Sequence, residues 1–130
     1  MHGLPVREIT TLNAPPSIGP FSQAIETNGT RYVSGQGPID PETEKTVERD
    51  PTVQTRQTLE SVATILDGAD RSLADVMKST FFLSDMCHYD AVNKVYGDML
   101  TEPFPARSAL EVVRLPVDIL VGIEVIAEGK

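Results

Sequence analysis

The chain has 130 residues, of which 40% are hydrophobic and 23% charged, and it contains no Trp. This length fits one domain over residues 1–130, and a chain of this size buries about 65% of its unfolded surface. The 19 acidic residues outnumber the 11 basic ones and give a net charge of −8. Because phosphate backbones are bound by basic stripes, this charge argues against a nucleic-acid partner.

The few cysteines and histidines argue against a disulfide-stabilised protein and against a zinc protein. The chain has one cysteine, Cys87, and two widely separated histidines, His2 and His88. An intramolecular disulfide is therefore excluded, and no spacing is typical of a zinc site. The sequence shows neither a run of 18 apolar residues nor a signal-peptide core, so we expect no membrane partner and a cytoplasmic location.

Strand-like and helix-like segments alternate along the chain in the order β, ββ, α, β, α, ββ. The predicted strands are residues 6–10, 23–26, 31–34, 76–83, 107–115 and 119–127. One predicted helix starts at Asp50-Pro51 and ends at Gly68, and a second opens at Asp90 and stops before Pro103. This order predicts an α+β fold, in which one mixed sheet carries both helices on one face.

Local patterns support this assignment. Asn28-Gly29 between two strand-like runs is a strong signal of a β-hairpin, and the prolines within residues 13–20 predict a rigid loop. Apolar residues recur at helical spacing in both predicted helices. They are Leu59, Val62, Ala63 and Leu66 in the first, and Val92, Val95, Tyr96 and Met99 in the second.

The last predicted strand alternates between two faces. One face carries Ile119, Val121, Ile123, Val125 and Ala127, and the other carries Leu120, Gly122, Glu124, Ile126 and Glu128. With the helices on the first face, the second is either solvated or an oligomer wall. Leu120 and Ile126 favour an oligomer, since a solvated face usually alternates more cleanly to polar residues.

Few residue groups in this chain are typical of catalysis. Cys87 and His88 are neighbours, and neighbouring side chains rarely face each other, so a Cys/His nucleophile is not favoured. Gly35-Gln36-Gly37 is followed by Pro38, which excludes a helix-forming phosphate loop.

Arg107 is the strongest candidate for binding a ligand. It follows Pro103 and Pro105 at the start of a predicted strand, so its backbone is stiff. A guanidinium grips a carboxylate with two parallel hydrogen bonds. The alternative is a surface or intra-sheet salt bridge, for example with Glu111 on the same strand face.

Five separated segments resemble the RidA/YjgF family, the reactive-intermediate imine deaminases, in order and spacing from about residue 8 to residue 128. They are residues 14–24 (APPSIGPFSQA), 33–36 (VSGQ), 54–57 (QTRQ), 92–96 (VNKVY) and 104–108 (FPARS). The resemblance implies a chorismate-mutase-like α+β fold, a homotrimer with sites between subunits, and no metal or organic cofactor.

The resemblance also implies an activity, a hydrolase that converts 2-iminobutanoate- or 2-iminopropanoate-type imines and enamines to 2-oxo acids and ammonia. In the family this is metabolite damage control. By resemblance Arg107 is catalytic and binds the substrate carboxylate. The other implied substrate-binding positions are Phe21, Ser34, Gly35, Asn93, which would brace the site loop, and Ala109.

Three departures from the family pattern bear on this activity. Phe21 stands where the family usually has tyrosine, and Ala109 where it often has cysteine. Gly122 stands where deaminase members often carry the glutamate that places the attacking water. Glu124 lies on the same strand face about 6.6 Å farther along, and loss of a general base typically costs 10²–10⁴-fold in rate.

Alternative functions follow from these departures. The chain is a deaminase of 2-imino acids, a deaminase of another enamine such as an aminomuconate, or a small-carboxylate-binding protein with weak or no turnover. A ribonuclease or chaperone role is the third reading, and the net charge of −8 and the lack of a histidine pair argue against ribonuclease chemistry.

Overall fold

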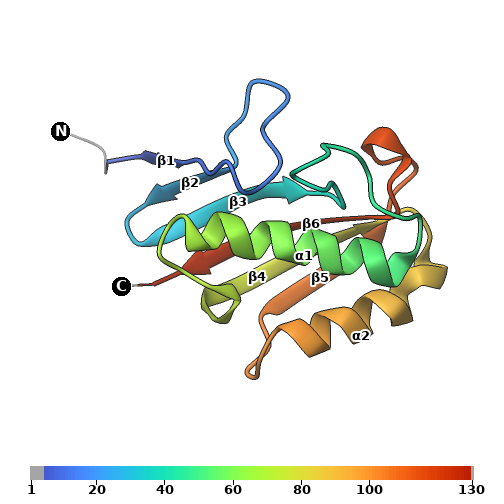
Figure 1. Ribbon diagram of the computed structural model, residues 1–130. Helices are drawn as coiled ribbons and strands as arrows, with labels where there is room; N and C mark the ends of the chain where they lie inside the picture. Colours follow the sequence, from blue (N-terminus) through green and yellow to red (C-terminus); the bar gives the residue numbers. More distant parts are fainter. Residues whose placement is uncertain (1–4, 130) are drawn as a thin grey trace.

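The computed structural model describes residues 5–129, which form one six-stranded sheet with both long helices on the same side (Figure 1). The strands are β1 (Arg7–Ile9), β2 (Ala24–Thr27), β3 (Thr30–Gln36), β4 (Val76–Leu83), β5 (Ala106–Glu111) and β6 (Val121–Glu128). The helices are α1 (Pro51–Asp67) and α2 (Tyr89–Met99), with short 3-10 turns at Leu73–Asp75, Met86–His88 and Pro116–Asp118. The predicted α+β fold is confirmed.

The strand order is β1-β2-β3-β6-β4-β5. All neighbouring strands are antiparallel except β4 and β5, which are parallel. The chain reaches β5 by crossing over through α2, so β5 forms the edge of the sheet. This edge position matters below because β5 carries Arg107.

The predicted hairpin is confirmed between β2 and β3. Asn28 and Gly29 have φ angles of 50° and 80°. Positive φ at both central residues gives a turn whose twist matches that of the strands, and glycine and asparagine adopt it most readily. This turn fixes the register that pairs Ala24 with Val33.

Helix α1 begins and ends where the sequence predicts. The Asp50 carboxylate accepts a hydrogen bond from Val53 N at 3.0 Å, and Pro51 occupies the first turn. Leu59, Val62 and Leu66 are buried against the sheet. A capped, amphipathic helix of this kind covers the centre of the sheet.

Helix α2 starts at Tyr89, one residue before the expected Asp90, because a 3-10 turn precedes it. The Asp85 carboxylate accepts a hydrogen bond from Cys87 N at 2.8 Å and opens that turn. Val92 and Val95 are buried as predicted. The turn sets the angle at which α2 passes β5.

The last two strands differ from the prediction in length and in pairing. β5 ends at Glu111 rather than at residue 115, because Val112 N donates to Leu83 O at 2.9 Å and the chain then leaves the sheet. β5 and β6 do not pair with each other, since β4 lies between them. The expected short turn is a longer loop that arches from the edge of the sheet to its centre.

The last strand begins later than predicted. Ile119 and Leu120 precede β6 and are buried. The backbone N of Leu120 donates to Gln54 Oε1 on α1 at 2.9 Å. Within β6, Gly122, Glu124 and Ile126 lie on one face, as expected.

The two faces of the sheet differ in character. The helix-side face holds the core, including Phe81, Val121 and Ile123, all fully buried. The opposite face, called here the open face, is covered by none of the helices in residues 5–129 (Figure 1). Tyr32, paired with Ile126 across β3 and β6, is 48% exposed there.

Candidate functional site

Arg107 lies on β5 with its side chain on the helix side of the sheet. It is the register partner of Ser79 on β4, and Ser79 is fully buried beneath α2. Because β5 is an edge strand, the Arg107 side chain reaches the rim of the core and is half-buried.

Three aromatic rings surround the Arg107 guanidinium; Arg107, Phe81, Tyr89 and Tyr96 are called here the arginine cage. The guanidinium carbon lies 4.8 Å from the ring centre of Phe81 and 5.5 Å from those of Tyr89 and Tyr96. Contacts of this kind attract the cation electrostatically. They also place low-dielectric walls around a permanent positive charge.

The cage has one directional contact. Arg107 Nη2 donates to the Tyr89 hydroxyl at 2.8 Å. Over residues 5–129, no carboxylate lies within salt-bridge distance of Arg107. Glu111, the salt-bridge partner considered from the sequence, instead accepts from Met86 N at 2.9 Å. The guanidinium therefore keeps N–H donors for an external anion.

Tyr96 anchors the floor of the cage. Its hydroxyl and that of Ser79 are hydrogen-bonded at 2.8 Å, and its ring meets Phe81 edge to face at 4.9 Å. Burial raises the pKa of Tyr96, so this phenol is neutral at physiological pH. A neutral floor leaves the charge of Arg107 uncompensated.

Asn93 lies on α2 between the two tyrosines of the cage. It follows Tyr89 by four residues and precedes Tyr96 by three, so all three share one face of the helix. Its Oδ1 is buried and has no hydrogen-bond partner among residues 5–129. An unpaired buried acceptor costs free energy. The bracing role implied for this residue stays a prediction.

Ser34, Gly35 and Phe21 lie elsewhere in the protomer. The Ser34 hydroxyl donates to Ser22 O at 2.6 Å, and Gly35 is exposed with open space where a side chain would stand. Phe21 is 51% exposed. Three strand spacings separate β3 from β5, about 14 Å. One copy of the chain thus does not bring these residues to Arg107, whereas Ala109 follows Arg107 on the same side of β5.

Gly122 and Glu124 lie on the open face, on the side of the sheet away from Arg107. Gly122 pairs with Phe82, and Glu124, which is exposed, pairs with Thr80. A Cβ at Gly122 would lie 3.7 Å from Gln36 O and 3.9 Å from a methyl of Leu115, which is ordinary contact. A Cβ atom therefore fits at Gly122, which is itself buried, without displacing its neighbours.

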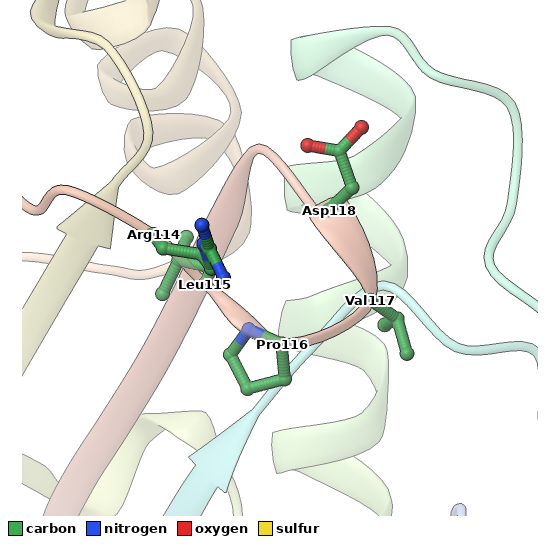
Figure 2. A pocket seen from close by; sticks show the side chains of 5 residues that line it. All are labelled: Arg114, Leu115, Pro116, Val117 and Asp118. Carbon is green, nitrogen blue, oxygen red and sulfur yellow. The ribbon is translucent and has the colours of Figure 1, made fainter.

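The loop between β5 and β6 forms an open hollow of about 490 Å³ next to Gly122. Figure 2 shows that its lining residues all come from this loop and that Val117 and Asp118 point in different directions from it. Both have positive φ, 49° and 55°. Asp118 is also in salt-bridge contact with Arg49 at 3.5 Å. Because a single loop lines it, the hollow gathers no catalytic set of its own.

Cys87 and His88 contact each other, contrary to the expectation for sequence neighbours. The Cys87 sulfur lies 3.7 Å from His88 Nδ1. However, the hydrogen bond with the Asp85 carboxylate raises the pKa of the Cys87 thiol. A nucleophilic cysteine needs a lowered pKa, so this pair does not form an activated thiolate.

Tyr89 is the functional candidate that the sequence reasoning missed. The apolar periodicity of the second helix dominates its sequence pattern. Side chains that can form hydrogen bonds nevertheless recur at positions 89, 93 and 96 on one face of the same helix. That recurrence was the available signal. Because 18 residues separate Tyr89 from Arg107, their contact could not be predicted from local sequence patterns.

Comparison with known proteins places the chain in a family. The family model described as Endoribonuclease L-PSP matches residues 11–129. A RutC family protein of Pyrococcus horikoshii is 49% identical over 119 residues, which cover 92% of this chain and 94% of that protein. The 2-iminobutanoate/2-iminopropanoate deaminase of Salmonella typhimurium is 41% identical over 124 residues, covering 93% and 96%.

A solved structure agrees with this assignment. The crystal structure of Escherichia coli TdcF with bound serine superposes with a TM-score of 0.89 at 34% identity, covering 95% of this chain and 99% of that one. The family match spans most of the chain, and the identities exceed what a shared fold alone produces. The chain therefore belongs to the Endoribonuclease L-PSP family, that is, the RidA/YjgF family.

Proposed function

We propose that the protein is a hydrolase that converts small 2-imino acids and their enamine tautomers to 2-oxo acids and ammonia. The observation that carries this proposal is Arg107, a half-buried cation in an aromatic cage with no carboxylate partner over residues 5–129. The name of the Salmonella typhimurium relative, a 2-iminobutanoate/2-iminopropanoate deaminase, supports the same substrate class.

Arg107 would capture the substrate through its carboxylate. A guanidinium has five N–H donors and matches a carboxylate with two parallel hydrogen bonds. One donor is used by Tyr89, and the cage walls strengthen the remaining interactions by lowering the local dielectric. In a chain of net charge −8, one fixed cation directs an anionic substrate to this place.

The reaction needs water as its only co-reactant. Water adds its oxygen to C2 of the protonated imine, a proton moves from that oxygen to the nitrogen, and the C2–N bond breaks to leave the 2-oxo acid and ammonia. Asn93, on the same face of α2 as Tyr89 and Tyr96, would brace the site, as the resemblance implies. Because imines already hydrolyse in water, positioning and charge stabilisation are sufficient, with no metal or organic cofactor.

The complete site requires more than one copy of the chain. Arg107 and Glu124 lie on opposite sides of the sheet, so one protomer cannot present both to the same substrate. We therefore place the site in a homotrimer, between the arginine cage of one copy and the open face of the next. There Ser34, Gly35 and Phe21 would line the wall, and Glu124 would position water.

A second function is favoured by Gly122. No side chain stands at this open-face position, although a Cβ there would make only ordinary contacts. A trimer that binds small carboxylates but turns them over weakly, or one that accepts a bulkier enamine such as an aminomuconate, is consistent with that space and with Phe21, which has no hydroxyl. The acidic charge of the chain argues against extending the ribonuclease activity in the family description to it.

In the cell the proposed activity would remove reactive enamines that escape from pyridoxal-phosphate-dependent dehydratases. We place it in the cytoplasm, where such enzymes release their products. Within residues 5–129, the structure has no helix of the length and apolarity that crossing a bilayer requires.

Substitution of Arg107 tests the proposal. A dehydratase generates 2-iminobutanoate in situ, and its disappearance is followed with and without the protein. We expect wild type to accelerate the loss, and Arg107→Ala to lower kcat/KM by at least about 100-fold because two charged hydrogen bonds are lost. Arg107→Lys should recover little, since an ammonium lacks the planar fork.

Arg56→Ala is the matched control, because Arg56 is exposed on α1. It should keep wild-type activity. Wild type that does not accelerate imine loss, or Arg107→Ala that accelerates it equally, would refute the deaminase assignment.

A further inference from the structure

We infer that Tyr89 is a positioning residue, whose hydroxyl holds the guanidinium of Arg107 in the orientation that receives a small carboxylate. This inference rests on the proposed function of Arg107. It gives Tyr89, at the start of α2, a role that the proposed deaminase function does not require.

The first argument concerns what the rings of the cage cannot do. Phe81 and Tyr96 are buried, meet each other edge to face, and both lie within 5.5 Å of the guanidinium carbon. Ring contacts attract a cation but do not select which N–H points where. The guanidinium could still turn within its own plane, so a directional partner is needed to fix its orientation.

The Tyr89 hydroxyl is that directional partner. It accepts from Arg107 Nη2 at 2.8 Å, and this is the one hydrogen bond of the Arg107 side chain over residues 5–129. With Nη2 fixed, the positions of Nη1 and Nε follow, because the guanidinium is rigid and planar. Those groups remain as donors for a ligand oxygen.

Tyr89 is itself held in place from β5, the strand that carries Arg107. Its backbone N donates to Met86 O, and Met86 N donates in turn to the Glu111 carboxylate at 2.9 Å. Glu111 lies four residues after Arg107 on β5. These contacts form a closed ring. They run from Arg107 to Tyr89, through the 3-10 turn to Glu111, and back along β5 to Arg107, so the hydroxyl and the guanidinium are fixed relative to each other.

A closed ring of contacts has a consequence for binding. A flexible arginine loses side-chain conformational entropy when a ligand immobilises it. An arginine already oriented by Tyr89 loses less, so carboxylate affinity is higher than for the same cation without the hydroxyl. The hydroxyl thus contributes to affinity without touching the reacting atoms.

Tyr89→Phe tests the inference, because it keeps the ring and removes only the hydroxyl. We expect the Kd of 2-oxobutanoate, measured by calorimetry, and the KM for 2-iminobutanoate to rise together by about tenfold. We expect kcat to change less than twofold. Thr52→Val removes a hydroxyl from the exposed side of α1 instead, so it is the control and should leave Kd, KM and the melting temperature unchanged.

A second readout does not depend on the proposed activity. The Nη resonances of Arg107 in ¹⁵N NMR report rotation of the guanidinium, which we expect to be slow in wild type and faster in Tyr89→Phe. Tyr89→His, measured above pH 8, offers a neutral ring nitrogen as acceptor and should recover part of the affinity.

The outcomes separate the inference from the function that it deepens. Wild type that neither binds 2-oxobutanoate nor hydrolyses the imine would refute the proposed function, while the NMR readout would still test the contact. Unchanged Kd, KM and guanidinium rotation in Tyr89→Phe would overturn the inference, as would a lower melting temperature with no change in affinity.

Discussion

At the scale of single residues, the arginine cage combines a permanent charge with a neutral phenol. Tyr96 is 4% exposed, and its hydroxyl is bonded to that of the fully buried Ser79. Burial disfavours the phenolate and raises the pKa of Tyr96. The pair holds α2 against β4 directly beneath Arg107.

This raised pKa predicts how stability depends on pH. The folded state holds the Tyr96 proton more tightly than the unfolded state, whose pKa is about 10. The stabilisation is therefore fully present below pH 10 and is lost as the pH rises through the folded-state pKa. Urea unfolding of wild type between pH 8 and pH 11.5 should show a falling free energy above about pH 10.

The Tyr96→Phe variant separates this contribution from other titrations. At pH 8 it should be less stable than wild type by about 1–3 kcal/mol, because the Ser79 hydroxyl is left unpaired in the core. Above pH 10 its free energy should fall less steeply. Thr52→Val, which removes an exposed hydroxyl on α1, should keep the wild-type profile, and equal slopes in all three proteins would contradict the prediction.

The residue scale also shows what could be predicted from the sequence. Arg107 was found because it follows two prolines in a recognisable segment, which is a local signal. Its partner Tyr89 was not found, since the contact joins β5 to α2 across 18 residues. The considered partner, Glu111, was plausible from strand spacing but is bonded to Met86 N instead.

At the scale of elements, strands and helices with local signals were predicted well. The Asn28-Gly29 hairpin, the capped helix α1 and strand β4 all lie where turn residues, caps and β-branched runs place them. The position of β4 between β5 and β6 was not predictable, because it follows from a crossover rather than from any local pattern. The last strand was predicted to start two residues too early, at Ile119, because the apolar run continues past the start of β6.

Strand β6 allows a direct test of the weak-turnover alternative. Gly122→Glu adds a carboxylate to the open face, where its Cβ meets no atom closer than 3.7 Å. If a missing carboxylate limits catalysis, this variant should hydrolyse 2-iminobutanoate at least about 100-fold faster than wild type, the lower end of what a general base contributes.

Gly97→Glu provides the control for this substitution. Gly97 is exposed on α2 and also has open space for a side chain, so any effect of added charge alone would appear there. We expect wild-type rates in this control. A Gly122→Glu protein that folds, binds 2-oxobutanoate and hydrolyses the imine at the wild-type rate would show that the carboxylate was not limiting.

At the scale of the whole molecule, the open face is the surface through which the proposed trimer would assemble. Tyr32 is 48% exposed and Leu110 is 41% exposed on this face. Ile126, on the neighbouring strand β6, pairs with Tyr32 on the same face. Apolar side chains gathered on an uncovered sheet are typical of a protein interface. The opposite side of the sheet is already covered by the two helices (Figure 1).

Ile126→Lys should separate the subunits of the proposed homotrimer. Light scattering of wild type is expected to give about three times the 14.1 kDa chain mass, and the variant should give the single-chain mass because a charge is costly in an apolar interface. Glu60→Lys, on the exposed side of α1, is the control and should remain trimeric. A wild-type mass of one chain would refute the assembly.

The opposite placement of Arg107 and Gly122 has a genetic consequence. In the proposed trimer each polypeptide supplies the anion-binding half of one crevice and the water-facing half of another. Two alleles, each defective in a different half, would then restore some intact crevices when their products mix. Complementation of that kind is a property that a self-contained active site does not have.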